Sequence, residues 1–227
     1  MFDFYDIDSL LSEEERAVRA SVRAFVDERV LPIIGKCYVE GRFPRSPAWW
    51  GMLLLITTEA TLFALFLVSY FYLRFESIGP WPPNGSDPKL LVPTVMTALL
   101  MASSVPAYLA DTSIRRGDVD RLRFYLASTL VLGAAFLALQ AYEYHDKLRS
   151  LRPQDDAYGS LFYTITGLHG AHVIVGLVLL GWVLFWAIRG RYGAHRCVPV
   201  EISSLYWHFV HVVWLFVYLS LYLSPRL

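Results

Sequence analysis

Two histidines, His208 and His211, stand three residues apart within a long apolar run near the end of the chain. Because a helix places residues i and i+3 on one face, both imidazoles would share a face with Glu201 upstream. Ionisable groups in such a segment are costly, and they normally face protein or water rather than lipid. The spacing therefore predicts a functional polar face on the last helix.

A second set of ionisable residues lies in earlier apolar runs. Glu59 stands about ten residues into its run, so roughly 15 Å deep and near the middle of a ~30 Å hydrocarbon core. His172, with His169 three residues before it, lies at a comparable depth, and so does His211. Glu59, His172 and His211 could therefore meet if their helices are neighbours.

Three interpretations of this buried set remain open. The favoured one is a hydrogen-bonded network that fixes helix packing, because Gly167, Gly170 and Gly176 would let helices approach closely. The second is a proton relay through Glu59, since carboxylates and histidines within the membrane usually form such relays. The third is metal or haem ligation by the two HxxH pairs, which is a weak motif.

Three further candidates lie near the ends of apolar runs. Glu143 is near the outer end of the third run, where the favoured interpretation is a hydrated interfacial carboxylate and the alternative is a contact with a partner subunit. Arg189 and Arg191 end the fourth run on the inner side. Topology accounts for both arginines, and a lipid phosphate could also bind there.

The composition indicates a protein with several membrane spans. Hydrophobic residues make up 56% of the 227 residues and charged residues only 18%, below the roughly 25% of an ordinary soluble domain. The net charge of zero gives no indication of nucleic acid binding. Cys37 and Cys197 are isolated, so the chain has no CxxC motif, no CxxCH haem-attachment motif and no disulfide framework.

Five apolar segments are each near the ~20 residues that a spanning helix needs, and their backbone must bond internally as helix. They lie at about 49–73, 91–110, 123–144, 160–188 and 204–223. Lys and Arg number 14 on one side of these segments and 6 on the other. We therefore expect an all-α bundle of five transmembrane helices, with the N-terminus cytoplasmic and the C-terminus periplasmic.

Residues 1–46 have a different, highly charged composition. Ser12 followed three residues later by Glu15 predicts a capping box, and an apolar stripe at helical spacing follows it. Pro32 is expected to end this helix. We therefore expect a soluble amphipathic helix in a cytoplasmic extension, residues 1–46, ahead of a membrane domain, residues 47–227.

Five sequence blocks between residues 48 and 227 carry a joint signature. They are Trp50-Gly51-Met52 with Thr58-Glu59, Trp81-Pro82-Pro83-Asn84-Gly85, Leu139-Gln140-Ala141-Tyr142-Glu143-Tyr144, Tyr158 to His172 with its Gly167-Leu168-His169-Gly170-Ala171-His172 core, and Tyr206-Trp207-His208-Phe209-Val210 with Val212-Val213-Trp214-Leu215-Phe216. In this order they resemble cytochrome c oxidase subunit III, in a five-span bacterial form. One block alone is only moderately specific, whereas the ordered set is highly specific.

The resemblance implies a multi-pass subunit of a haem–copper terminal oxidase in a bacterial inner membrane. Such a complex takes electrons from cytochrome c or quinol, reduces oxygen to water and pumps protons. The family's subunit III holds no haem or copper, which belong to partner subunits. It packs against the catalytic subunit I in a complex that also contains subunit II. It also binds phospholipid between its helices and supports proton uptake and stability.

This chain departs from the family's pattern at its N-terminus and at two membrane positions. His211 replaces an Asp, so a Glu–His contact would form there if Glu59 is near. The second apolar segment lacks the family's usual Asn and His and has Asp111 near its end. Residues 1–44 resemble the start of an acyl-CoA dehydrogenase, but no flavin or catalytic-base region follows. A gene-fusion remnant or a misjoined open reading frame is the favoured account, and a genuine cytosolic appendage is the second.

Other functions remain as alternatives. A quinol oxidase or a nitric oxide reductase complex could contain a related subunit. From other classes, a b-type haem membrane anchor would ligate haem through its histidines, and a small transporter would usually show internal repeats. No internal repeat is evident, which argues against the transporter.

Overall fold

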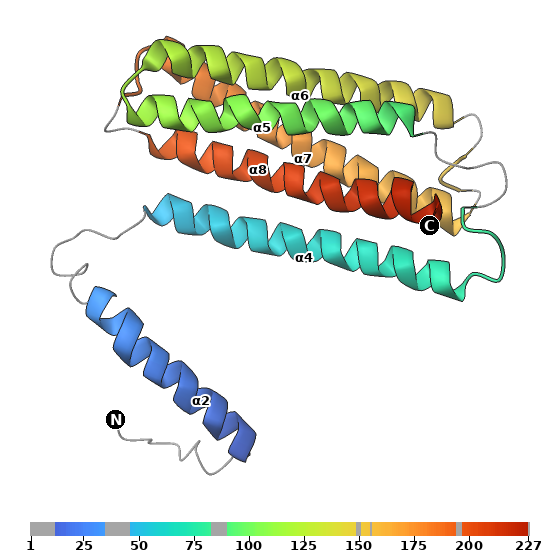
Figure 1. The fold of residues 1–227 in the computed structure, drawn as a ribbon, viewed down its shortest axis with the longest axis horizontal. Coiled ribbons are helices and arrows are strands. Elements are labelled where there is room, and N and C mark those ends of the chain that lie inside the picture. Colours follow the sequence, from blue (N-terminus) through green and yellow to red (C-terminus); the bar gives the residue numbers. More distant parts are fainter. Residues whose placement is uncertain are drawn as a thin grey trace. The chain divides into compact units, whose positions relative to one another are not determined.

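Helices are the only regular secondary structure in the residues that the computed structural model describes, and no strand occurs among them. The described residues are 12–34, 46–82, 90–148, 151–154, 156–193 and 197–226. The chain divides into two compact units, Met1–Ser46 and Pro47–Leu227, and Figure 1 shows the helices of both. The all-α prediction is confirmed.

The described part of the first unit begins with a helix that has the predicted N-terminal cap. Helix α2 (Glu13–Phe25) follows Ser12, whose Oγ accepts from the Glu15 backbone N–H at 3.3 Å, while the Ser12 N–H donates to Glu15 Oε2 at 2.8 Å. These two bonds form the capping box. The Ser12 backbone N–H is the main reason that the pKa of Glu15 lies below its ordinary value.

The predicted end of this helix at Pro32 is wrong. A π-helical turn (Val26–Val30) follows α2, and the chain stays helical through residue 34. In an α-helix a proline ring clashes with the carbonyl of residue i−4. A π turn is wider than an α turn. The π turn ends two residues before Pro32 and contains Glu28, the residue whose carbonyl the ring would meet in a regular α-helix.

Among the described residues of the second unit, five helices are long and apolar enough to cross a membrane. They are α4 (Pro47–Glu76), α5 (Leu91–Arg115), α6 (Val119–Lys147), α7 (Ala157–Ile188) and α8 (Val198–Tyr218). A π-helical turn (Leu219–Leu223) and a 3₁₀ turn (Ser224–Arg226) extend α8. Each helix extends beyond its predicted apolar core by polar or capped turns, such as the first turn of α8, which carries Pro199.

Local signals in the sequence set several of these helix ends. The carboxylates of Asp118 and Asp156 cap α6 and α7, each accepting from the backbone N–H three residues later. Gly117 and Gly190 follow the C-terminal caps of α5 and α7 with positive φ angles of 78° and 72°. Glycine adopts this left-handed conformation without a Cβ penalty, and so it terminates both helices cleanly.

Helices α5, α6, α7 and α8 pack around a shared core, and α4 lies along α8 and α7 (Figure 1). The fully buried indole of Trp207 on α8 fits against Gly133 of α6 and Gly176 of α7. A Cβ at either glycine would lie within 2.8 Å of that indole. Small residues therefore create the space for Trp207, as expected for close helix packing in a membrane.

Helix α4 is attached less extensively. Phe63 and Tyr70 are its only buried residues. At its C-terminal end the Arg74 guanidinium donates to the Ser224 side-chain and backbone oxygens at 2.6 and 2.9 Å. A second polar attachment of α4 is made by Glu59, which is part of the candidate site.

Candidate functional site

Glu59 of α4 and His172 of α7, which the sequence places at a similar depth, are in direct contact. Glu59 Oε2 lies 3.0 Å from His172 Nε2, and His172 Nδ1 lies 2.8 Å from the Leu168 carbonyl oxygen. Since a carbonyl only accepts, Nδ1 must carry a hydrogen. A hydrogen bond between Nε2 and Glu59 then requires one more proton. If this proton is on Nε2, the pair is ionic, and if it is on Glu59, a neutral carboxylic acid donates to the imidazole.

The Glu59–His172 pair borders an apolar groove rather than a sealed core. The two side chains are 29% and 13% exposed. Beside them is a groove of about 420 Å³ whose other walls are formed by the side chains of Met52, Leu55, Ala171, Val175, Leu179 and Tyr206. Phe63 packs edge-on against His172 with ring centroids 5.1 Å apart. The pair thus places a carboxylate and an imidazole at the edge of a mostly apolar groove, together with the hydroxyl of Tyr206.

His169 lies one turn away from this pair and does not contact a carboxylate. It is fully buried among the rings of Phe63, Phe136 and Trp214, with centroids 6.3, 5.8 and 5.0 Å away. Neither ring nitrogen has a hydrogen-bond partner among the described residues. Among all the residues that the structure describes, no group of three or more His, Cys, Asp or Glu side chains could hold a metal ion. The metal-ligation interpretation gains no support here.

His211 lies at a different interface, between α8 and α5. It is 4% exposed, with Nε2 2.9 Å from Ser103 Oγ and Nδ1 2.5 Å from the Trp207 carbonyl oxygen. The Glu–His contact suggested for His211 is therefore made by His172 instead. His208 is half-buried beside it, with ring centroids 6.0 Å apart.

A seam of polar contacts joins α5 to α8 over much of their length. Thr97 Oγ1 accepts from Trp214 Nε1 at 2.9 Å, and the Ser204 hydroxyl donates to the Ala107 carbonyl at 3.4 Å. The Ser103–His211 contact lies between these two bonds. The polar face predicted on the last helix is thus packed against a neighbouring helix rather than exposed.

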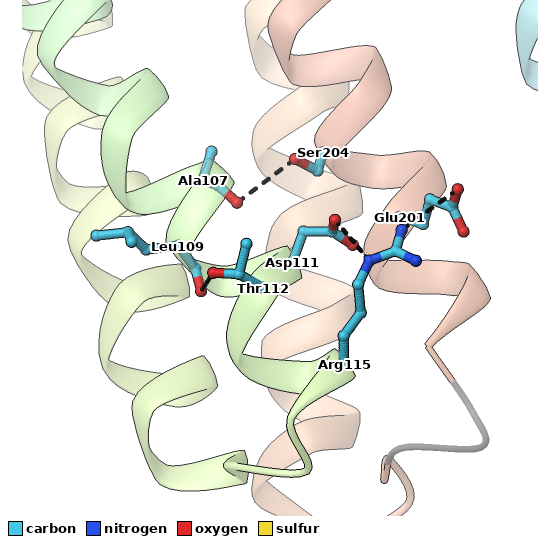
Figure 2. A network of polar contacts seen from close by, with 7 residues as sticks. All are labelled: Ala107, Leu109, Asp111, Thr112, Arg115, Glu201 and Ser204. Atoms are coloured by element: carbon cyan, nitrogen blue, oxygen red, sulfur yellow. Dashed lines mark hydrogen bonds and ion pairs between the residues drawn. The ribbon is translucent and has the colours of Figure 1, made fainter.

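Glu201 belongs to an ion-pair cluster at the end of the bundle where α5 ends and α8 begins, here called the Arg115 end. Arg115 bridges two carboxylates, with Nε 3.0 Å from Asp111 Oδ2 and Nη2 3.4 Å from Glu201 Oε1. Figure 2 shows this cluster with Ser204 and Ala107 one layer deeper. Sequence reasoning missed Arg115, although its spacing of four residues from Asp111 is a recognisable helical signal.

Glu143 is buried, so the expected hydrated carboxylate is wrong within this chain. Its side chain is 6% exposed, with Oε1 3.0 Å from Lys147 Nζ, and the Tyr222 hydroxyl donates to Oε2 at 3.2 Å. Lys147 Nζ also lies 4.0 Å from the centre of the Phe162 ring. The π-helical turn after α8 buries Tyr222 and so positions it against Glu143. Lys147 was also missed, although it too follows its partner by four residues.

Arg189 and Arg191 stack on aromatic rings where α7 ends. Arg189 lies 4.2 Å from the Phe185 ring centre, and Arg191 lies 3.9 Å from the Trp186 ring centre. Arg123, from the start of α6, donates to the Ala187 carbonyl at 2.9 and 3.1 Å and so tethers the same helix end. Two cationic groups are thereby presented side by side at the Arg115 end.

The same membrane-spanning region matches known proteins. A family model described as cytochrome c oxidase subunit III matches residues 44–225. The cytochrome c oxidase subunit 3 of Coturnix japonica is 40% identical over 179 residues, covering 76% of this chain and 68% of the relative. That of Gallus gallus gives the same figures. That of Thermostichus vulcanus is 34% identical over 177 residues, covering 78% of this chain and 87% of the relative.

Proposed function

Because the chain belongs to the cytochrome c oxidase subunit III family, we propose that it is a non-redox supporting subunit of a haem–copper terminal oxidase. The observation that carries the proposal is the match of one family model to almost the whole membrane unit, from residue 44 to residue 225. In this role the chain packs against the catalytic subunit I beside subunit II. The haem and copper lie in those partners.

The Glu59–His172 pair is the proposed centre of this supporting role. One proton is held between a carboxylate and an imidazole at the edge of an apolar groove. The primary role that we assign to the pair is to hold α4 against α7. A relay of protons toward the catalytic subunit is the second role that the same chemistry permits. His169, His208, His211, Glu143 and Glu201 belong to the surrounding polar network.

Arg189 and Arg191 are the proposed phospholipid contacts. Both are held at the end of α7 by stacking on aromatic rings, which leaves their N–H groups available to phosphate oxygens. The excess of Lys and Arg on this side of the membrane supports a cytoplasmic Arg115 end and N-terminus in a bacterial plasma membrane. An anionic phospholipid of that leaflet is the expected ligand.

The type of oxidase complex and the origin of the N-terminal unit each have an alternative explanation. The complex could accept electrons from cytochrome c or from quinol, and a nitric oxide reductase complex is a related assembly. The N-terminal unit lies almost entirely outside the region matched by the family model. We treat it as a cytoplasmic appendage, of which a gene-fusion remnant is the favoured origin.

Purification of the tagged chain from its native membrane in a mild detergent tests the proposal. The expected result is co-purification with a haem–copper subunit and a complex that reduces oxygen. The chain separated from that complex is expected to have no Soret absorption. Recovery of the chain without any haem–copper partner would reject the proposal, and a Soret band in the separated chain would favour the b-type haem anchor.

A further inference from the structure

The ring of His211 has a polar partner at both nitrogens, although it lies within the membrane-spanning part of the chain. Nδ1 is 2.5 Å from the Trp207 carbonyl oxygen, and Nε2 is 2.9 Å from Ser103 Oγ. A carbonyl oxygen can only accept, so Nδ1 carries a hydrogen in every favourable arrangement. Whether the ring is neutral or cationic therefore depends on whether Nε2 accepts or donates.

The Ser103 hydroxyl can serve either state of that nitrogen. A hydroxyl donates one hydrogen bond and accepts two. The Trp207 Nε1–H, which can only donate, lies 3.2 Å from Ser103 Oγ and uses one acceptor position. The remaining neighbours are the Leu100 carbonyl oxygen at 2.7 Å and His211 Nε2 at 2.9 Å.

Two complete hydrogen-bond arrangements follow from this geometry. When the Ser103 hydroxyl donates to Nε2, His211 is a neutral imidazole. When the hydroxyl donates to the Leu100 carbonyl instead, Ser103 Oγ accepts from an Nε2–H and His211 is a cation. Rotation of one hydroxyl converts the first arrangement into the second, and each ring nitrogen keeps a partner in both.

We propose that His211 is a reversible proton-binding site inside the membrane-spanning bundle, with Ser103 as the hydroxyl that accommodates both protonation states. A buried charge is costly unless it is hydrogen-bonded. Here the cation would be bonded at both ends to oxygen atoms. The site concerns residues of this chain alone and does not depend on the redox partner.

The titratable groups around His211 come from each neighbouring helix. On α8 itself His208 has its ring centroid 6.0 Å away. His169 of α7 is within electrostatic range of His211, and Asp111 of α5 is within electrostatic range of His208. Glu59 of α4 is bonded to His172. Among the described residues no carboxylate is hydrogen-bonded to His211, so its proton is held by neutral oxygens.

His208 gives the site a connection to the Arg115 end. It is half-buried, and it lies between His211 and the Asp111–Arg115–Glu201 cluster drawn in Figure 2. The side chains of Asp111 and Glu201 in that cluster are 19% and 17% exposed, so the cluster is in contact with the surroundings of the bundle. His208 is therefore the imidazole that lies between His211 and the charged end of the bundle.

Nitrogen NMR of the full-length chain in lipid nanodiscs, labelled with ¹⁵N only in histidine, tests the site directly. The signal lost in His211→Gln identifies His211. The expected neutral form carries its hydrogen on Nδ1, and lowering the pH from about 9 to about 4 is expected to protonate both nitrogens. A neutral form with its hydrogen on Nε2, or a ring that stays in one state throughout, would overturn the proposal.

Two substitutions at Ser103 separate the hydroxyl from the space that it fills. In Ser103→Ala the cation loses a charge-assisted hydrogen bond, so the proton-binding constant of His211 should fall by roughly tenfold or more. In Ser103→Thr the hydroxyl is retained, so the constant should stay within about threefold of the original. An unchanged constant in Ser103→Ala would contradict the assigned role. If that variant does not fold, the tautomer of the unaltered chain still decides.

Discussion

Glu59 and His172 hold one proton between two helices that are otherwise only lightly joined. Their oxygen and nitrogen lie 3.0 Å apart, and the second imidazole nitrogen is already committed to the Leu168 carbonyl. Removing the carboxylate therefore leaves an imidazole nitrogen unpaired next to an apolar groove. Changing it to an amide does not, because the amide N–H can donate to a neutral imidazole.

Substitution of Glu59 should separate packing from proton transfer. Glu59→Leu is expected to lower the free energy of unfolding by about 1–3 kcal/mol, the usual cost of an unsatisfied buried group. Glu59→Gln should stay within about 1 kcal/mol, since its hydrogen bond is kept. Thermal unfolding and proton-uptake rates of the assembled oxidase provide both measurements. A stable Glu59→Gln oxidase that has lost proton uptake would assign the pair to a relay.

The glycines beside Trp207 should not tolerate a methyl group. In Gly176→Ala the new Cβ would lie 2.7 Å from the indole, so a loss of about 1–3 kcal/mol in unfolding free energy is expected from overpacking. Gly181→Ala is the matched control, because it lies on the same helix with no atom within 4 Å of its Cβ position. Denaturation of each purified variant in detergent gives its free energy of unfolding. Equal values for Gly176→Ala and Gly181→Ala would refute the close fit of Gly176 against Trp207.

The buried Glu143–Lys147 pair should lose more stability when one of its two charges is removed than when both are removed. Lys147→Met leaves the 6% exposed Glu143 carboxylate without its cation, which typically costs about 3–5 kcal/mol. The double variant Glu143→Gln with Lys147→Met should lose much less, because no buried charge remains. Unfolding of the single and double variants measures this coupling, and additive losses would mean that the two residues act independently.

The N-terminal turn of α2 should respond to acid. The pKa of Glu15 is lowered in the folded helix by the Ser12 backbone N–H, so the cap contributes stability above the unfolded pKa of Glu15. This contribution should be lost as the pH falls through the lower, folded pKa. Amide hydrogen exchange at residues 13–16 of the full chain measures the loss. Glu15→Gln removes the carboxylate that accepts from the Ser12 N–H, so its exchange should show no such loss at low pH, and a loss that persists in this variant would contradict the capping role.

Loss of the stacked arginines should release lipid. Oxidase with Arg189→Gln and Arg191→Gln is expected to retain fewer anionic phospholipid molecules, because two phosphate-binding cations are removed. Mass spectrometry of lipids that co-purify gives the count. Arg116→Gln is the control, since this exposed arginine lies at the same end of the bundle. Equal lipid counts in the double variant and the original protein would exclude these two residues as the site.

Composition and spacing predicted the broad features of the fold because those features depend on short-range chemistry. The five spans follow from apolar length, and the cap at Ser12 follows from one side chain and its neighbour three residues on. The depth of Glu59 and His172 also follows from residue counts. These predictions needed no knowledge of which helices are neighbours.

The environments of Glu143 and His211 depend on contacts between helices. The burial of Glu143 requires the π-helical turn that brings Tyr222 inward, and no sequence signal marked that turn. The partner of His211 is a single serine 108 residues earlier, one among several serines at plausible depth. Tertiary packing selected Ser103, so its role could be found only in three dimensions.

The wide separation of Glu59 from His172 along the chain has a consequence for synthesis. Glu59 enters the membrane early, whereas its partner lies 113 residues later. At roughly 5–20 residues per second, the carboxylate waits on the order of 6–20 s before the imidazole is even made. During that interval α4 lacks its polar contact with α7. The attachment of α4 through Glu59 is therefore completed only after most of the membrane unit has been synthesised.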